Sequence, residues 1–227
     1  MASEEVESYL YSEEAIYFRS SASWRVRIAL EWKGIDYEYR NVDLVKGTQQ
    51  SEEYLKINPT GKVPALITKE GKALTQSEAI LEYIEEIKPE RPMLPKGAIH
   101  RAQVRAITQT IACDIHPLQN LGVLIHAGGS DQEKRVEWAN YWITKGFTGL
   151  EVMLEQYAGT YCVGDHITMA DMFLVPMVYN AQRYKVDMKA FPLITRISNT
   201  LMTLPEFQNS HPANQPDAPE EMKNSAK

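Results

Sequence analysis

The chain has 227 residues, of which 44% are apolar and 24% are charged, a composition typical of a globular protein with one large or two modest domains. Its net charge of -6 argues against nucleic acid or an anionic membrane as the main partner. The two cysteines, Cys113 and Cys162, have no CxxC spacing, and the five histidines show no metal-ligand spacing. We therefore expect no disulfide framework and no metal site, and we expect both cysteines to pack in the core of a protein from a reducing compartment.

Residues 1–14 are rich in glutamate and lack both the basic character of a transit peptide and the apolar centre of a signal peptide. No stretch of the chain approaches the ~18 uninterrupted apolar residues that a membrane-spanning helix needs. The sequence thus predicts a cytoplasmic protein, without a membrane segment, that begins with an acidic extension over residues 1–14.

The next segment, residues 15–89, alternates between strand-like and helix-like patterns. We expect a strand at 15–18, a helix at 21–33 and a second strand at 37–42. A short helix at 51–57, a hairpin of 63–68 with 72–74, and a last helix at 77–88 are expected to follow. Gly34 supplies a stop signal for the first helix. This order predicts an α/β thioredoxin-like domain with a mixed four-stranded sheet.

A proline-rich linker follows, and the remainder of the chain reads as helical. The sequence predicts an all-α domain over residues 97–208 and an irregular tail over residues 209–227. One helical segment is expected to kink at Pro117, and three more helices are expected at 131–157, 168–181 and 191–204. The run from Thr168 to Asp171 has the pattern of a capping motif at a helix start.

The first chemical signal is a cluster of serines where the first strand meets the first helix. Three hydroxyl groups are expected beside the free N–H groups of the first helical turn, with three arginines nearby: Ser20, Ser21, Ser23, Arg19, Arg25 and Arg27. Such a helix N-terminus is suited to hold an anion. The same pattern is also consistent with an ordinary serine-capped helix.

Two more signals follow the serine cluster in the chain. At Val63-Pro64 a strand opens on a proline, where a cis peptide would turn the Val63 backbone outward to pair with an extended peptide ligand. At Gln76-Ser77 a helix opens, with Ser77 as the expected N-cap, and its donors can take a carboxylate. Each signal alone also has a simpler interpretation: Val63-Pro64 as a proline that starts a strand, and Gln76-Ser77 as an ordinary helix cap. Together the three signals stand in the order that a glutathione site requires, for the thiol, the peptide backbone and the γ-glutamyl carboxylate.

On these motifs the chain resembles the zeta class of glutathione transferases, the class of the maleylacetoacetate isomerases. The resemblance covers residues 15–219. In the first domain it is carried by Arg19-Ser20-Ser21, Trp24 to Leu30, Lys33 to Tyr37, Asn58-Pro59 and Gln76-Ser77. In the second domain it is carried by Pro117 to Leu121, Tyr161 to Asp165, Thr168 to Asp171 and His211 to Asp217.

The resemblance implies a homodimer of the glutathione transferase fold that uses glutathione as a coenzyme to isomerise maleylacetoacetate to fumarylacetoacetate in phenylalanine and tyrosine breakdown. The thiolate would add to the conjugated double bond, the resulting single bond would rotate, and elimination would return the trans alkene. The implied catalytic residue is Ser20, with Ser21 as second choice. The implied glutathione contacts are Ser20, Ser21, Gln49, Val63, Gln76, Ser77 and Asn120, and a one-residue length difference leaves the alignment open between Gln49 and Gln50. The implied substrate-binding residues are Arg19, Arg25 and Arg183.

Two residues depart from the class pattern. Ala22 stands where the class has a cysteine, and His116 stands where it more often has glutamine. Because the species to be stabilised is the thiolate of glutathione, a serine O–H and a helix N-terminus can act without a second thiol, so we expect Ala22 to be attenuating or neutral. Two alternatives stay open: a broader glutathione transferase acting on small α-halo acids, and a non-catalytic glutathione-binding protein. The intact Ser20-Ser21 and Gln76-Ser77 argue against the second.

Overall fold

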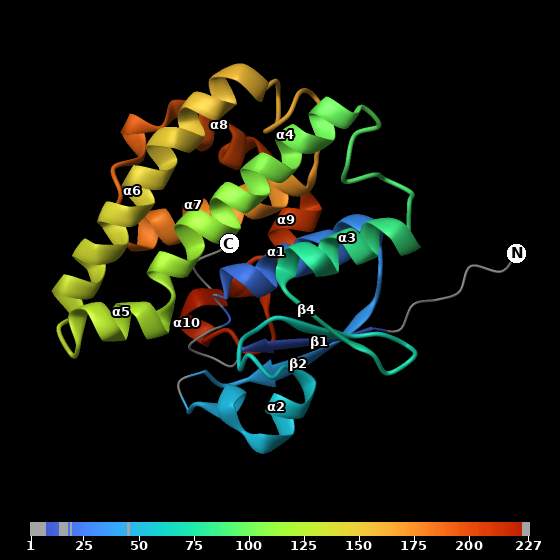
Figure 1. Ribbon diagram of the computed structural model, residues 1–227, viewed down its shortest axis with the longest axis vertical. Coiled ribbons are helices and arrows are strands. Elements are labelled where there is room, and N and C mark those ends of the chain that lie inside the picture. Colours follow the sequence, from blue (N-terminus) through green and yellow to red (C-terminus); the bar gives the residue numbers. More distant parts are fainter. Residues whose placement is uncertain (1–7, 14–17, 19, 45, 224–227) are drawn as a thin grey trace, which may run out of the picture. The chain divides into compact units, whose positions relative to one another are not determined.

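The structure is a computed structural model that describes residues 8–13, 18, 20–44 and 46–223, without the side chains of residues 8–13 (Figure 1). It forms two compact units, one of Met1–Arg91 with Leu204–Lys227 and one of Pro92–Thr203. The expected helical domain covers residues 97–208, with residues 209–227 as an irregular tail. The structure instead groups the chain from Leu204 onward with the first unit, because the indole of Trp24 and the guanidinium of Arg27 bond to Ser210.

The first unit contains the expected mixed four-stranded sheet, in the order β2-β1-β3-β4. Strand β1 runs parallel to β2, with Ser8 opposite Tyr37, and antiparallel to β3, with Leu10 opposite Leu66. Strands β3 and β4 form an antiparallel hairpin. The strands are β1 (Ser8–Glu13), β2 (Tyr37–Val42), β3 (Ala65–Ile67) and β4 (Ala73–Thr75).

The first strand does not lie where the sequence analysis placed it. Strand β1 falls within the segment expected to be an acidic extension, whereas residues 15–17 of the expected strand lie outside the described residues. The run Tyr9-Leu10-Tyr11 has the aromatic and aliphatic residue types that favour strands. Strand β1 therefore forms in spite of the nearby glutamates, because it hydrogen-bonds to β2 on one side and to β3 on the other.

Helices α1 (Ser21–Lys33) and α3 (Ser77–Ile87) pack against each other in this unit. Every residue of α1 from Ser23 to Leu30 is buried, and Gly34 ends the helix in the left-handed conformation that the sequence analysis expected there, with a φ of 59°. The smaller helices are η1 (Thr48–Gln50), α2 (Glu52–Ile57), α9 (Pro205–Asn209), η5 (Pro212–Asn214) and α10 (Glu220–Lys223).

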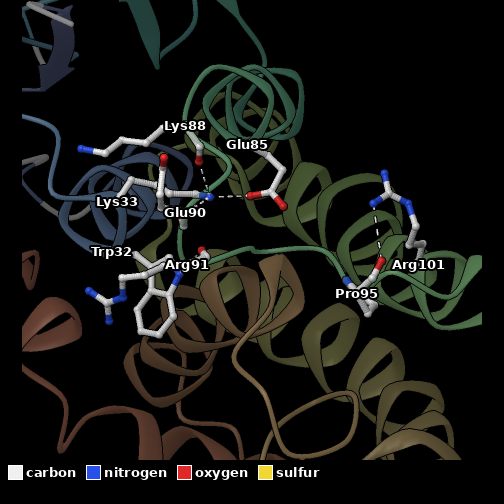
Figure 2. A network of polar contacts seen from close by, with 8 residues as sticks. All are labelled: Trp32, Lys33, Glu85, Lys88, Glu90, Arg91, Pro95 and Arg101. Atoms are coloured by element: carbon white, nitrogen blue, oxygen red, sulfur yellow. Dashed lines mark hydrogen bonds and ion pairs between the residues drawn. The ribbon is translucent and has the colours of Figure 1, made fainter. Parts of the chain in front are cut away.

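A buried lysine joins the C-terminal ends of α1 and α3, as Figure 2 shows. The side chain of Lys33 is fully buried, and its Nζ lies 2.6 Å from Glu85 Oε2. The same ammonium donates to the main-chain oxygens of Lys88 at 2.7 Å and Glu90 at 2.9 Å. All three donors of the ammonium are thus satisfied, which is the condition for burying such a charge.

The second unit is helical, as predicted. Its helices are α4 (Ala98–Gln109), α5 (Leu121–Gly128), α6 (Gln132–Tyr157), α7 (Met169–Arg183), η4 (Met188–Ala190) and α8 (Pro192–Leu201). Helix α7 is buried along most of its length and packs against α4, α6 and α8. Asp171 accepts hydrogen bonds from the N–H of Thr168 at 2.8 Å and the N–H of Cys162 at 2.9 Å, so the expected motif holds the start of α7.

The helical path changes before Pro117, where the sequence analysis expected a kink. A π-helical turn, η2 (Thr110–Ile115), leads into a 3-10 turn, η3 (His116–Gln119). Cys113 lies within the π-helical turn and is exposed, whereas Ile111 and Ile115 are its buried residues. Cys162 is buried as expected, and burial raises its pKa, but the expectation that Cys113 packs in the core was wrong.

Within the described ranges, no helix is both long and apolar enough to cross a membrane. The same residues contain no group of three or more histidine, cysteine, aspartate or glutamate side chains placed to hold a metal ion.

Replacement of Lys33 by methionine is expected to lower the free energy of unfolding by about 3 kcal/mol, because it removes the buried ammonium that pairs with the mostly buried carboxylate of Glu85. Urea unfolding measures this change. Lys56→Met is the matched control, because Lys56 pairs with Glu52 on an exposed helix surface and such pairs contribute about 0.5 kcal/mol. Equal losses in the two variants would contradict the role of the Lys33 ammonium.

His211 gives the stability of the protein a pH dependence. Burial, and to a lesser degree the charge of Arg27, hold the pKa of His211 below its ordinary value of 6.5, and its Nδ1 accepts from the N–H of Ala213 at 3.1 Å. The unfolded chain therefore takes up the proton first, so stability is lost as the pH falls below about 6.5. His211→Asn retains a hydrogen-bond acceptor, and it is expected to reduce the change in melting temperature between about pH 7 and pH 5. His126→Asn, at an exposed position, is the control for losing a histidine. A variant that melts with the wild-type pH dependence would refute this assignment.

Candidate functional site

The N-terminus of α1 has the properties of an anion site. Ser20 is the N-cap, and its Oγ accepts from the N–H of Ser23 at 3.2 Å and from the O–H of Ser23 at 3.0 Å. Because this oxygen accepts both bonds, the hydroxyl hydrogen of Ser20 can be donated to a ligand. Among the described residues the N–H of Ala22 has no hydrogen-bond partner, and the first turn holds no acidic residue. This end of α1 can therefore stabilise a negative charge.

Burial distinguishes the two predicted serines. Ser21 is 4% exposed, whereas Ser20 is only half-buried. Ser20 is thus more accessible to a ligand than Ser21. Ala22 is half-buried and contributes only its main chain there. Arg19, one of the predicted substrate contacts, lies outside the described residues.

The main chain at Val63 is open to an extended ligand. The Val63-Pro64 peptide is cis. The preceding carbonyl, of Lys62, accepts from the hydroxyl of Tyr54 at 2.7 Å and from Nδ2 of Asn58 at 2.5 Å. In the part of the chain that the structure describes, neither the N–H nor the C=O of Val63 has a hydrogen-bond partner. Both groups can thus pair with the backbone of a bound peptide.

The start of α3 differs in one respect from the sequence analysis. The N-cap is Gln76, and Ser77 is the first helical residue. Gln76 has a φ of 70°, which is uncommon for a residue with a side chain and occurs often at binding sites. Its exposed side chain makes no hydrogen bond to any described residue. The N-terminal N–H groups of α3 can meet a carboxylate here, although Ser77 is not the cap that we expected.

Arg25 links these two helix starts and does not face a substrate. It is 2% exposed, and its Nη1 donates to the Oγ of Ser77 at 3.2 Å. This burial corrects the expectation that Arg25 contacts the substrate. The sequence analysis could not detect the link, because the two residues are separated by 52 positions.

The structure also separates the two neighbouring glutamines of η1. The side-chain amide of Gln50 donates to the carbonyl of Gly61 at 3.3 Å. In contrast, Oε1 of Gln49 is buried and has no hydrogen-bond partner among the described residues. Because a buried polar atom without a partner is rare, Gln49 is the stronger candidate for a ligand contact.

Two predicted residues belong to the second unit. Asn120 is the N-cap of α5, and its side chain makes no cap bond. The adjacent Gln119 accepts from Asn180 Nδ2 at 3.1 Å and donates to the carbonyl of His116 at 3.2 Å, so α7 holds this turn in place. Arg183 is the exposed last residue of α7, over the ring of Tyr184 at 5.3 Å, with no carboxylate partner among the described residues.

A cavity of about 1000 Å³ lies along α6, lined in part by Asn140, Tyr141 and Lys185. None of the predicted site residues lines it. The lining includes Gln132 and Glu133 at the N-terminus of α6, but Asp131 caps that end by accepting from the N–H of Glu133 at 3.0 Å, and Glu133 and Glu137 add negative charge. This cavity is therefore unsuited to an anion, and we place the candidate site at α1, Val63 and α3.

Comparisons with known proteins find one family over both units of the chain. Residues 16–86 match the glutathione S-transferase N-terminal domain, and residues 143–205 match the C-terminal domain. A maleylacetoacetate isomerase of Dictyostelium discoideum is 50% identical over 218 residues, covering 94% of this chain and 97% of the relative.

Two solved structures are also similar. A bacterial zeta-class maleyl pyruvate isomerase has a TM-score of 0.87 at 37% identity, covering 93% of this chain and 100% of that one. A maleylacetoacetate isomerase of Methylobacterium extorquens AM1, with bound malonate and glutathione, has a TM-score of 0.87 at 38% identity, covering 93% and 99%. The chain therefore belongs to the glutathione S-transferase family, in the zeta class with the maleylacetoacetate isomerases.

Proposed function

We propose that this protein uses glutathione as a coenzyme to isomerise maleylacetoacetate to fumarylacetoacetate. The observation that carries the proposal is the N-terminus of α1, where the Ser20 hydroxyl and the Ala22 N–H can both donate to an anion and no acidic residue opposes it. The names of the relatives support this reaction, and the glutathione and malonate bound to the Methylobacterium structure support a thiol coenzyme beside a small dicarboxylate.

The groups at the site fit glutathione. Ser20 and the first turn of α1 suit its sulfur, and the open main chain of Val63 suits its peptide. Gln76 and the start of α3 suit the γ-glutamyl carboxylate, with the unpartnered Oε1 of Gln49 available to a donor of the ligand. When bound, glutathione supplies a thiolate nucleophile that adds reversibly to the conjugated double bond and so permits rotation about it.

The contribution of the protein is to keep that thiol ionised. Lowering a thiol pKa by about two units requires ~2.7 kcal/mol. One charge-assisted hydrogen bond from Ser20, together with the N-terminus of α1, can supply that amount. The cysteine that Ala22 replaces is therefore not required for this step.

A direct assay distinguishes the three candidate functions. The proposal predicts turnover of maleylacetoacetate that requires glutathione and leaves its concentration unchanged. Stoichiometric consumption of glutathione with an α-halo acid, without isomerisation, would favour the broader transferase. Glutathione binding without any turnover would favour the non-catalytic binding protein, which the donor geometry at Ser20 disfavours.

We further propose that the chain acts as a cytoplasmic homodimer in phenylalanine and tyrosine breakdown. The class resemblance supports the dimer and the pathway. The cysteine content of the sequence, two residues without CxxC spacing, favours a reducing compartment. Analytical ultracentrifugation tests the dimer, and a monomer at micromolar concentration would refute it.

Ser20→Ala is expected to lower kcat for maleylacetoacetate by about 10²-fold, the usual loss when one donor to a developing anion is removed. Ser51→Ala is the matched control, because Ser51 caps α2 through the N–H of Tyr54 at 3.2 Å and is not part of the site. Near-wild-type activity of Ser20→Ala would overturn the assignment.

Arg183→Ala is expected to lower kcat/KM for maleylacetoacetate by about 10- to 150-fold, the effect of losing one charge-assisted hydrogen bond to a carboxylate. The affinity for glutathione should hardly change. Lys189→Ala removes a positive charge from an exposed position of the same unit and controls for long-range electrostatics. A loss of glutathione binding with unchanged substrate kinetics would move Arg183 out of the substrate site.

A further inference from the structure

The C-terminal segment is hydrogen-bonded to α1 through a buried serine, Ser210. This residue has no exposed surface. Its Oγ accepts from the indole Nε1 of Trp24 at 3.0 Å and donates to the carbonyl of Phe207 at 3.2 Å. Its main-chain oxygen accepts from Nε of Arg27 at 3.2 Å. One residue thus holds two side chains of α1 that are three positions apart.

The second of those side chains continues to the segment before α1. The guanidinium of Arg27 is fully buried, and its Nη2 donates to the carbonyl of Phe18 at 3.3 Å. A guanidinium is rigid and planar, so its bonds to Ser210 and Phe18 fix these two carbonyls relative to each other.

These contacts hold residues both before and after Ser20 in the sequence. Phe18, two residues before Ser20, is held by Arg27. Trp24, four residues after it, donates its own N–H to the carbonyl of Ser20 at 2.9 Å and is held through its indole by Ser210. The position of the Ser20 hydroxyl is therefore determined in part by a residue 190 positions further along the chain.

We propose that Ser210 is a positioning residue for Ser20, and that through Trp24 and Arg27 it keeps the first turn of α1 in the geometry that ionises the glutathione thiol. This inference rests on the proposed function for its chemical consequence. A hydrogen bond to an anion weakens steeply with distance and angle, so a small loosening of this turn reduces the stabilisation of the thiolate.

The test compares Ser210→Ala with Tyr39→Phe. Each variant removes one hydrogen bond between the C-terminal segment and the rest of the unit. Ser210→Ala removes the bond from Trp24, and Tyr39→Phe removes the bond that the hydroxyl of Tyr39, on strand β2, donates to Asp217 Oδ1 at 2.9 Å. Three quantities are measured: the melting temperature, amide hydrogen exchange at Ser23 and Trp24 in the ligand-free protein, and the thiol pKa of bound glutathione from its thiolate absorbance.

Both variants are expected to lower the melting temperature. Only Ser210→Ala is expected to speed exchange at Ser23 and Trp24 and to raise the thiol pKa of bound glutathione by about half to one unit, the effect of weakening one hydrogen bond. Arg27→Lys, which keeps the charge but not the planar fork, is expected to do the same. If Ser210→Ala loses stability as Tyr39→Phe does, but keeps the wild-type exchange rates and the wild-type thiol pKa of bound glutathione, then the role of Ser210 is purely structural. That result would overturn the proposal.

Two further outcomes are decisive. If Ser210→Ala does not fold, Trp24→Phe removes the same hydrogen bond from the donor side and is judged by the same measurements. If the wild-type protein binds no glutathione, the proposed function fails and the thiol consequence with it. The exchange measurement still reports whether Ser210 holds the first turn of α1, so the two failures are distinguishable.

Discussion

The site depends on two arginines that α1 buries. Arg25 is 2% exposed and Arg27 is fully buried, although a guanidinium loses much hydration energy when it leaves water. That cost is tolerable only when hydrogen bonds replace the water. Arg25 donates to Ser77 at the start of α3, and Arg27 donates to the carbonyls of Phe18 and Ser210. These hydrogen bonds tie the two guanidinium groups to Ser77, Phe18 and Ser210, and Ser77 and Phe18 lie next to the helix starts of the candidate site.

This arrangement explains how an acidic chain can hold an anionic ligand. With a net charge of -6, the field of the whole protein does not attract anions. The N-termini of α1 and α3 supply partial positive charge at two points instead. Arg25 bonds to Ser77 at the start of α3, and Arg27 bonds to Phe18 just before α1. Charge that the protein keeps out of solvent is also screened less by salt than charge on its surface. Hydrogen-bond donors at the site, rather than the net charge of the protein, therefore attract the anionic ligand.

Much of the first unit could be predicted from the sequence, because hydrophobic periodicity and turn residues are local signals. They indicated α1, β2, the hairpin and α3, and the serine cluster marked the correct helix start. What could not be predicted depended on contacts between distant residues. No local pattern shows that Arg25 and Arg27 are buried, that Ser210 returns to α1, or that Gln76 rather than Ser77 caps α3. Cys113 was misplaced because its burial was expected from the residue type alone, whereas Ile111 and Ile115 occupy the buried face of this segment and Cys113 is exposed.

The central claim is that a serine hydroxyl at the N-terminus of α1 activates the coenzyme thiol in a chain where Ala22 replaces the cysteine of its class. The most direct measurement restores the missing thiol. Steady-state turnover of maleylacetoacetate is compared between the wild-type protein and Ala22→Cys, at saturating glutathione. We expect kcat to differ by less than about fivefold, because one charge-assisted hydrogen bond and the helix N-terminus are sufficient to ionise the thiol. A gain of about 100-fold or more in Ala22→Cys would show that the protein thiol is needed, and would contradict the account.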